Sequence, residues 1–395
     1  MSRIFVTGMG VISPIGTNVA SNRVALKEGR SGLSSIELFE TKYASLLPFG
    51  EIKITNEFLK DKLQAQTPGI TRTTLLALHA FNEAVNDSRL SPAQIEQYDT
   101  ALIIGNTVGG MCVTDELYRD ANQNQVGSSY LSSYDLGSVA IYIQKRYGIN
   151  GVVNSINTAC SSSANAIMYG ARLIKSGLAK RAIVGGVDSL AKFTINGFSS
   201  LNILSPSPCR PFDMARCGLN LGEGAAFLVI EGEEDVNGKK VYAEVSGYAN
   251  TNDAFHPSSL SDNGDGPYLA MTQALEVAGL KPEQIGFIHA HGTGTENNDE
   301  AESKAFLRVF KSPPPFASIK SNIGHTLGAA GAFGALFGIM NLEFQEVYPG
   351  LNFNEPIAST GLSPQTEYEQ MKLEHIMANS FGFGGNCSSL IFSKV

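Results

Sequence analysis

The chain has 395 residues, which at about 150 residues per domain predicts two or three structural units. Charged residues make up 17% of the chain and apolar residues 43%, a balance that excludes a disordered or coiled-coil protein. The 29 Lys and Arg residues are outnumbered by 37 Asp and Glu residues. This net charge of -8 disfavours nucleic acid as a partner, because binding a duplex requires a positive surface.

The five cysteines are scattered and form no CxxC pair, so they indicate neither a disulfide framework nor a zinc ribbon. The apolar run at residues 4–6 is too short for the core of a signal peptide. No uninterrupted apolar run approaches the roughly 18 residues of a membrane span. We therefore expect a cytoplasmic protein that binds neither membranes nor nucleic acid.

The first part of the chain alternates short β-rich runs with a helical pattern, as in α/β proteins. The predicted strands cover residues 4–7, 101–104, 151–156 and 182–184. The first strand is expected to end at Gly8, and a helix over residues 161–176, closed by Gly177, connects the last two strands. A strand–helix–strand unit of this kind predicts a buried parallel sheet.

The second part repeats this style of element order. Strands are predicted at residues 241–245, 287–290, 316–319, 376–379 and 389–392, and helices at residues 268–278, 300–309 and 327–344. The polar segment 231–240 separates the two parts. We therefore expect an N-terminal domain at residues 1–235 and a C-terminal domain at residues 236–395.

Cys160 lies in the segment TACSSS, where a predicted strand turns into a helix. A cysteine at such a junction faces the free N–H groups of the first helical turn and the positive end of the helix dipole. Both favour the thiolate and predict a pKa between about 3.5 and 7.5. The apolar residues that follow predict a buried helix. Taken alone, the segment fits a reactive nucleophile or a small buried hydrophobic residue.

His291 and His325 lie beside small residues that would let a ligand approach, in the segments HGTGT and KSNIGH. Both are candidates for acid–base chemistry or hydrogen bonding. His289 and His291 also form an HxH pair, but a lone pair of this kind is weak evidence for a metal, and His289 is expected to be a core residue. The glycines at Gly8, Gly10 and Gly16 do not have the spacing of a dinucleotide-binding fingerprint.

Several motifs in one order cover essentially the whole chain. They are TACSSS at Cys160, CRPFD at 209–213, LGEGA at 221–225, HGTGT at 291–295, KSNIGHTLGAAG from Lys320 and SFGFGG from Ser380. Together they resemble the β-ketoacyl-acyl-carrier-protein synthases, the condensing enzymes of fatty acid and polyketide synthesis, in their elongating Cys-His-His branch. The resemblance implies a thiolase-like α/β fold with two similar halves in a five-layered αβαβα arrangement.

The resemblance also implies an activity, decarboxylative Claisen condensation of a cysteine-bound acyl chain with a malonyl unit. Cys160 matches the acyl-accepting nucleophile, and His291 and His325 match the pair that assists decarboxylation and stabilises the enolate. Lys320 matches a supporting lysine with an electrostatic role. Substrates would arrive on the phosphopantetheine arm of acyl carrier protein, so no cofactor or metal of the enzyme's own is expected.

Five further positions match the family. Phe383 matches the gate phenylalanine, whose backbone N–H would form the oxyanion hole with that of Cys160. Thr293 and Thr295 match threonines that bind the phosphopantetheine arm. Asp299 and Glu302 match the acid pair behind the histidines, and we group them with the threonines as substrate-binding residues.

Some positions depart from the family pattern. Cys387, near the proposed oxyanion loop, has a counterpart in coenzyme A-dependent thiolases. Arg72 is the only charge between residues 67 and 78, and residues 201–208 contain none, so the basic surface that usually receives carrier protein is thin. Residues 111–114 and 193–204 are expected to set the depth of the pocket.

Four functional possibilities follow. The first two are a general β-ketoacyl synthase and a pathway-specific polyene or polyketide ketosynthase. The family usually forms homodimers, and a heterodimer with a chain-length-factor-like subunit is the alternative. A non-catalytic partner subunit and a thiolase are the other two possibilities, although retention of Cys160 and the motifs at His291 and His325 disfavour them.

Overall fold

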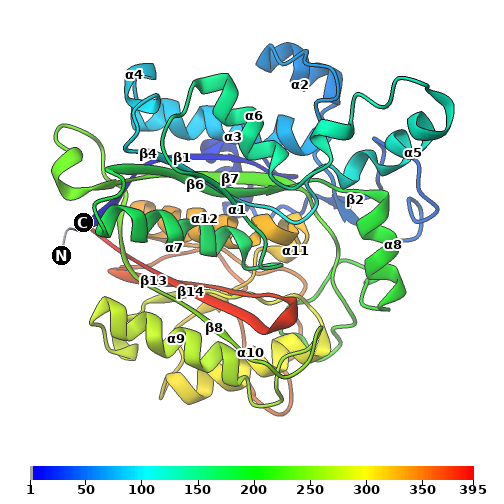
Figure 1. Cartoon of the computed structure of the whole chain (residues 1–395). Coiled ribbons are helices and arrows are strands. Elements are labelled where there is room, and N and C mark those ends of the chain that lie inside the picture. The colour runs from blue at the N-terminus through cyan, green and yellow to red at the C-terminus, as the bar shows by residue number, and fades with distance from the viewer. Residues whose placement is uncertain (1–2) are drawn as a thin grey trace.

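A main sheet of ten strands forms the framework of residues 3–395, the part of the chain that the computed structural model describes. The strand order is β10-β9-β13-β14-β8-β1-β7-β6-β4-β5. Strands β8 and β1 share only two residue pairs, Phe5 with Glu244 and Val6 with Ala243. The sheet therefore divides at this joint into two halves, which lie in separate layers (Figure 1).

The first half-sheet contains the nucleophile segment. Its strands are β1 (Ile4–Ile12), β4 (Thr100–Gly105), β5 (Val153–Ile156), β6 (Arg181–Asp188) and β7 (Gly224–Gly232). Strand β4 pairs in parallel with both β5 and β6, which confirms the predicted parallel sheet.

The prediction that the first strand ends at Gly8 is wrong. Strand β1 continues to Ile12 because helix α3 (Arg72–Ser88) packs directly on its glycines. A Cβ at Gly8 would lie 2.3 Å from the carbonyl oxygen of Ala84, and one at Gly10 would lie 2.1 Å from that of Ala80. These glycines therefore serve close helix–sheet packing and do not form a turn.

The second half-sheet contains the histidine segments. Its strands are β8 (Ala243–Asn252), β9 (Phe287–His289), β10 (Phe316–Ala317), β13 (His375–Phe381) and β14 (Asn386–Ser393). Each predicted strand of this half is present with shifted ends. All of its strands come from residues 243–393, whereas those of the first half come from residues 4–232. The domain boundary at residue 235 stays a prediction.

Helices cover both outer faces and fill the space between the half-sheets (Figure 1). Helices α3 and α6 (Ser138–Tyr147) lie over the first half-sheet, and α9 (Asp265–Ala278) and α10 (Glu296–Val309) lie over the second. Helices α7 (Ser162–Lys175) and α12 (Ala330–Phe344) form the middle layer. The five-layered αβαβα arrangement expected from the sequence is confirmed.

The segment 327–344 is long and apolar enough to cross a membrane by composition, but 78% of it is buried inside the protein. It forms α12 and the short 3₁₀ turn before it, packed between the two half-sheets. A Cβ at Gly331 would lie 2.6 Å from the backbone nitrogen of Ala164, so this glycine lets α12 approach α7 closely. The apolar composition is that of a central core helix.

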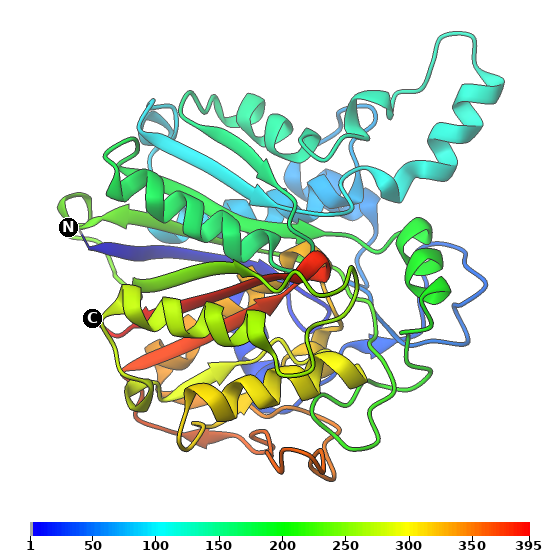
Figure 2. The ribbon, with the colours of Figure 1, turned by 60° about the horizontal axis from the view of Figure 1, so that its bottom comes forward.

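Smaller elements surround the layers. They are α1 (Val19–Lys27), β2 (Leu33–Ser34), β3 (Phe49–Gly50), α2 (Asn56–Leu63), α4 (Pro92–Ile95), α5 (Thr114–Gln123), α8 (Lys192–Ser200), α11 (Lys320–Ile323), β11 (Glu346–Val347) and β12 (Glu369–Gln370). Helix α5 and the loop after it extend away from the body of the protein (Figure 2).

Candidate active site

Cys160 lies in a tight turn between β5 and α7. Ala159, the residue before it, has φ +54°, a left-handed conformation that is unfavourable for alanine. The hydroxyl of Ser162 holds the turn by donating to the Ala159 carbonyl at 2.6 Å and accepting from the Thr158 N–H at 2.9 Å. The turn presents Cys160 to a cavity while leaving it only 7% exposed.

The prediction of a lowered pKa for Cys160 is wrong. Burial raises the pKa of this thiol to about 11, and the positive charge of Lys320 and the backbone N–H groups of Phe383 and Cys160 oppose the shift without reversing it. Removal of the thiolate from water costs more than the helix N-terminus returns. Cys160 is therefore mainly a neutral thiol at neutral pH.

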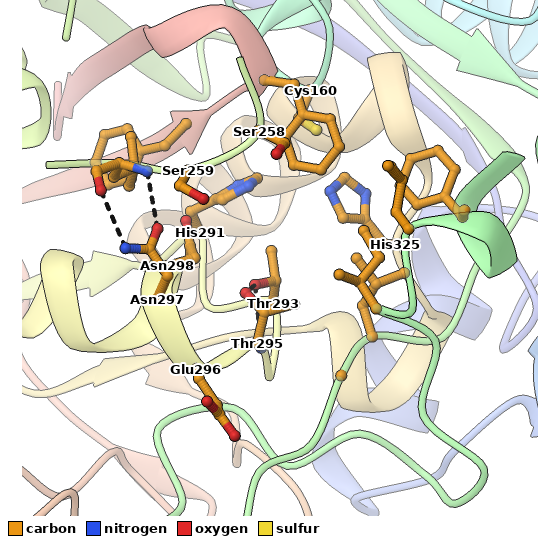
Figure 3. Close-up of a pocket in the computed structure, with 18 of the residues that line it drawn as sticks. Cys160, Ser258, Ser259, His291, Thr293, Thr295, Glu296, Asn297, Asn298 and His325 are labelled. Atoms are coloured by element: carbon orange, nitrogen blue, oxygen red, sulfur yellow. Dashed lines mark hydrogen bonds between the residues drawn. The ribbon is translucent and has the colours of Figure 1, made fainter. Parts of the chain in front are cut away.

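His291 and His325 come from separate loops of the second half and meet beside Cys160. His291 follows β9 and His325 follows α11. The Cys160 sulfur and one nitrogen from each imidazole all lie within 4.8 Å of one another. The rings are perpendicular, with centroids 5.4 Å apart and an interplanar angle of 83°. All three side chains border the same cavity (Figure 3).

The protonation of both histidines follows from their partners. Nδ1 of His325 accepts the Leu327 N–H at 3.0 Å, so a neutral His325 carries its proton on Nε2. Burial, and then the charge of Lys320, lowers the pKa of both histidines well below its usual value. Two neutral imidazoles therefore face the thiol.

Lys320 lies behind His291 and is not among the residues that line the cavity. Its ammonium nitrogen is 3.4 Å from His291 Nδ1 and also donates to the His291 carbonyl. Burial lowers the pKa of Lys320, and the neighbouring charges of Cys160, Glu302 and Asp299 oppose this shift. With Lys320 as the donor, Nδ1 of His291 is the acceptor and the proton of His291 lies on Nε2. Both imidazoles thus offer an Nε2–H donor.

Asp299 and Glu302 on α10 are fully buried and hold the loop after His291. Glu302 accepts the N–H groups of His291 and Gly292, both at 2.8 Å, and Asp299 accepts that of Thr293 at 2.8 Å. Burial raises the pKa of Glu302 to about 7. This placement differs from the expectation that the two carboxylates bind substrate, because their bonds go to the loop backbone and neither lines the cavity.

The loop that contains Phe383 covers the nucleophile turn. A Cβ at Gly382 would lie 2.8 Å from the Thr158 carbonyl oxygen and 3.0 Å from the Cys160 nitrogen, so only glycine fits this contact. The backbone N–H groups of Phe383 and Cys160 both lie against the sulfur. The Phe383 ring stacks on Phe198 with centroids 6.0 Å apart. Two converging N–H donors beside a nucleophile have the form of an oxyanion hole.

The cavity has a volume of about 450 Å³ and runs from Cys160 to the surface. Its hydroxyl and amide side chains include Thr293 and Thr295, whose hydroxyl oxygens are 2.8 Å apart. In Figure 3, Thr293, Thr295 and Glu296 follow one another away from Cys160. Among the described residues that line it, Glu296 is the only carboxylate and none is Lys or Arg.

Sequence analysis missed several residues of this wall. They are Ser258, Ser259, Leu260, Asn297, Asn298, Cys217 and Phe381. Asn297 bonds the backbone of Leu260 in both directions, at 2.8 and 3.0 Å, and so joins the loop after β8 to α10. Residues 250–266 are rich in Ser, Asp, Asn and Gly, and Phe381 belongs to the SFGFGG motif, so the sequence carried a signal for part of this wall.

The expected pocket-depth segments are only partly in place. Phe198, Leu201, Asn202 and Ile203 line the Cys160 cavity, as expected for residues 193–204. Residues 111–114 do not; they line a separate cavity of about 520 Å³, together with Arg72 and α8.

Two alternatives lose their structural basis. Cys387 is fully buried on β14, a Cβ at Gly266 would lie 2.9 Å from its sulfur, and it does not line the cavity. Burial raises its pKa, so it is unsuited to the acid–base role of a thiolase cysteine. His289 Nε2–H donates to Asn341 Oδ1 at 2.6 Å inside the core, as expected for a structural histidine and not for a metal ligand.

This fold and this site define a class, the thiolase-like condensing enzymes with a Cys-His-His centre. Residues 1–236 match the N-terminal domain of β-ketoacyl synthases, and residues 242–354 match the C-terminal domain. The chain belongs to the β-ketoacyl synthase family.

The chain aligns over its whole length with curated relatives and with solved structures. The chain is 33% identical over 412 residues to 3-oxoacyl-[acyl-carrier-protein] synthase 2 of Vibrio cholerae, covering 100% of this chain and 99% of that protein. The ishigamide ketosynthase/chain length factor structure has a TM-score of 0.92 at 30% identity, covering 100% and 99% of the two chains. A type II PKS acyl-carrier protein in complex with its ketosynthase gives 0.89 at 26% identity, covering 100% of both chains.

Proposed function

We propose that this protein is a β-ketoacyl-acyl-carrier-protein synthase that extends an acyl chain by decarboxylative Claisen condensation. The observation that carries the proposal is the meeting of one thiol, two neutral imidazoles and two backbone N–H donors at one end of a cavity. Chain extension requires a nucleophile that is also a leaving group and two sites for developing negative charge. The arrangement has each of these parts.

In the first half-reaction, the Cys160 sulfur attacks the thioester carbonyl of an acyl group on its carrier. The N–H groups of Phe383 and Cys160 bind the oxyanion of the tetrahedral intermediate. The carrier sulfur leaves, and the proton lost by Cys160 ends on that departing thiol. Because burial raises the pKa of Cys160, the thiol must lose its proton as the sulfur attacks.

In the second half-reaction, the carbonyl oxygen of a malonyl thioester accepts hydrogen bonds from the Nε2–H groups of His291 and His325. Loss of carbon dioxide leaves an enolate, which these donors stabilise without a full positive charge. Its carbon attacks the acyl thioester on Cys160 and expels the sulfur, which takes up one proton from solvent. The buried site keeps water away from the enolate.

The hydroxyl and amide wall suits an extended polar arm. We propose that Thr293 and Thr295 hydrogen-bond the phosphopantetheine arm of an acyl carrier protein, and that this arm removes the need for a separate cofactor. Asp299, Glu302 and Lys320 act behind the wall as positioning groups for His291. The cytoplasmic location stays a prediction from composition.

We propose that the carrier docks through apolar contacts. Arg72, the expected charge near the mouth, is buried and bonded to Glu223 at 2.6 Å, so it gives no charge to the surface. Leu201, 49% exposed, lines the cavity, and Phe255, 58% exposed, precedes Ser258 of the wall by three residues. Binding of the carrier should change less than about threefold between low and high salt, because apolar contacts are not screened.

A second copy, or a chain-length-factor-like subunit, is proposed to bind at β5. This strand is one of the two edges of the main sheet, and Val152 and Ile141 beside it are exposed. The segment around α5, which extends from the body, carries exposed Tyr118 and Val126 (Figure 2). Light scattering of the purified chain tests whether it forms a homodimer or requires a different subunit.

A pathway-specific polyene or polyketide ketosynthase is the second candidate. It is favoured by the thin basic surface and by the likeness to the ketosynthase/chain length factor structure. Incubation with a panel of acyl carriers, followed by mass measurement of the peptide that contains Cys160, tests both candidates. An adduct is expected in either case, and its mass identifies the chain type. No adduct from any donor would contradict the proposed function.

A further inference from the structure

Asp188, at the carboxyl end of β6, is a fully buried carboxylate that the reaction as described does not use. It accepts the N–H and hydroxyl groups of Thr107, at 2.9 and 2.7 Å, and the N–H of Val108 at 2.7 Å. It also accepts the N–H of Gly328 at 2.7 Å. One carboxylate therefore joins the loop after β4 in the first half to the turn after His325 in the second.

The turn that Asp188 anchors determines the protonation of His325. Leu327 donates its N–H to His325 Nδ1 at 3.0 Å, and Gly328, bonded to Asp188, is the next residue. Leu327 has φ +50°, a left-handed conformation that costs a leucine about 1 kcal/mol or more. The turn therefore requires support from outside itself.

Space around the turn is also limited. A Cβ at Gly328 would lie 2.9 Å from Asp188 Oδ2 and 3.0 Å from a methyl carbon of Thr107. The contact is thus close on both sides, and the carboxylate cannot move far without releasing Gly328. If Gly328 is released, Leu327 can return to a right-handed conformation, and its N–H no longer faces Nδ1.

We propose that Asp188 is a positioning residue that holds the Leu327–Gly328 turn, so that His325 keeps its proton on Nε2 and directs it into the cavity. The inference rests on the proposed function for the role of that donor. Burial raises the pKa of Asp188 to about 6, so the group is mainly a carboxylate acceptor at neutral pH. Its charge also lies near enough to Cys160 to oppose the thiolate.

The test compares Asp188→Asn with the wild-type chain. The amide keeps the volume but replaces one acceptor oxygen by a donor, which conflicts with the surrounding N–H groups. We expect malonyl decarboxylation to fall about ten- to a hundredfold, as when a group that orients a histidine is removed. Acylation of Cys160 should change by less than about threefold, because the N–H groups of Phe383 and Cys160 remain.

A spectroscopic measurement separates positioning from general damage. Labelling of the six histidines with 15N, with His325→Ala for assignment, reports whether Nδ1 or Nε2 of His325 carries the proton. In Asp188→Asn we expect part of the Nε2–H form to be lost at His325 while the His289 signal stays unchanged. A wild-type His325 signal with wild-type decarboxylation would overturn the proposal.

Glu83→Gln is the matched control. Glu83 also accepts backbone N–H groups from two segments, Val11 at 2.8 Å and Val19 at 2.9 Å, and it does not line the cavity. It should leave decarboxylation and the His325 signal unchanged. If Asp188→Asn does not fold, Asp188→Glu, which keeps the charge and displaces the oxygens, takes its place with the same expected changes. If the wild-type chain itself forms no Cys160 adduct, the proposed function fails, whereas the His325 signal still tests the role of Asp188.

Discussion

Cys160 is held by backbone geometry, whereas the two histidines are held by buried charged groups. On the cysteine side, Ala159 has a left-handed backbone and Gly382 packs against the turn. The backbone N–H groups of Phe383 and Cys160 lie against the sulfur. On the histidine side, Lys320, Glu302 and Asp299 contact His291 or its loop. The difference fits the chemistry, because the thiol needs a fixed position while the imidazoles need a fixed position and a fixed proton.

The largest expected effect tests whether the two sides act in separate steps. Cys160→Ala should abolish acyl transfer, a loss of at least about 10³-fold, because no other group can hold the acyl chain. It should keep malonyl decarboxylation, which needs only the histidines. Mass spectrometry measures the first reaction and release of carbon dioxide the second. Loss of both reactions in a folded variant would show that the sides are not independent.

The reverse separation is expected for the histidines. His291→Ala and His325→Ala should each lower decarboxylation about 10²- to 10³-fold, the usual effect of removing one donor to an oxyanion. Acylation of Cys160 should fall much less. His375→Asn, at the start of β13 and away from the cavity lining, is the control for a histidine change in general. Equal losses in both half-reactions would remove the assignment of the imidazoles to the enolate.

A smaller effect tests the backbone control of the cysteine side. Gly382→Ala would place a methyl group 2.8 Å from the Thr158 carbonyl oxygen, so the Phe383 loop must shift away from Cys160. We expect acylation of Cys160 to slow about ten- to a hundredfold, because displacement of a reacting group by about 1 Å has effects of this size. Gly197→Ala on α8, where no atom lies within 4 Å of the new Cβ, should have no such effect.

The smallest effect concerns stability and the buried histidines. Burial lowers the pKa of His289 to about 4, against about 6.5 when unfolded, so only the unfolded chain takes up this proton between those values. Stability is therefore present above about pH 6.5 and falls as the pH decreases, by about 1.4 kcal/mol per pH unit for this group. Denaturant unfolding of wild type and His289→Asn between pH 6.5 and 5 measures the difference in slope. Equal slopes would show that His289 takes up its proton equally in the folded and the unfolded chain, so that the fold does not lower its pKa.

Much of the fold was predictable from local patterns. The helix after Cys160 and the helix over residues 268–278 are confirmed within three residues at each end, because an apolar period and a closing glycine mark each of them. Strand β7 and helix α3 were missed, and β1 was predicted too short. Gly8 and Gly10 look like turn residues in the sequence, and only contact with α3 shows that they serve packing.

The sequence by itself determined the chemical groups of the site, because Cys160, His291 and His325 stand in the short motifs TACSSS, HGTGT and KSNIGH. Only the tertiary structure decided their states. The helix N-terminus predicted a thiolate, but burial by the second half of the chain raises the pKa of Cys160 to about 11. Asp299 and Glu302, which match an acid pair behind the histidines, were grouped with the substrate-binding residues, but their hydrogen bonds hold the loop after His291. Both corrections have one physical reason: desolvation and hydrogen bonding depend on groups distant in the chain, which local sequence does not specify.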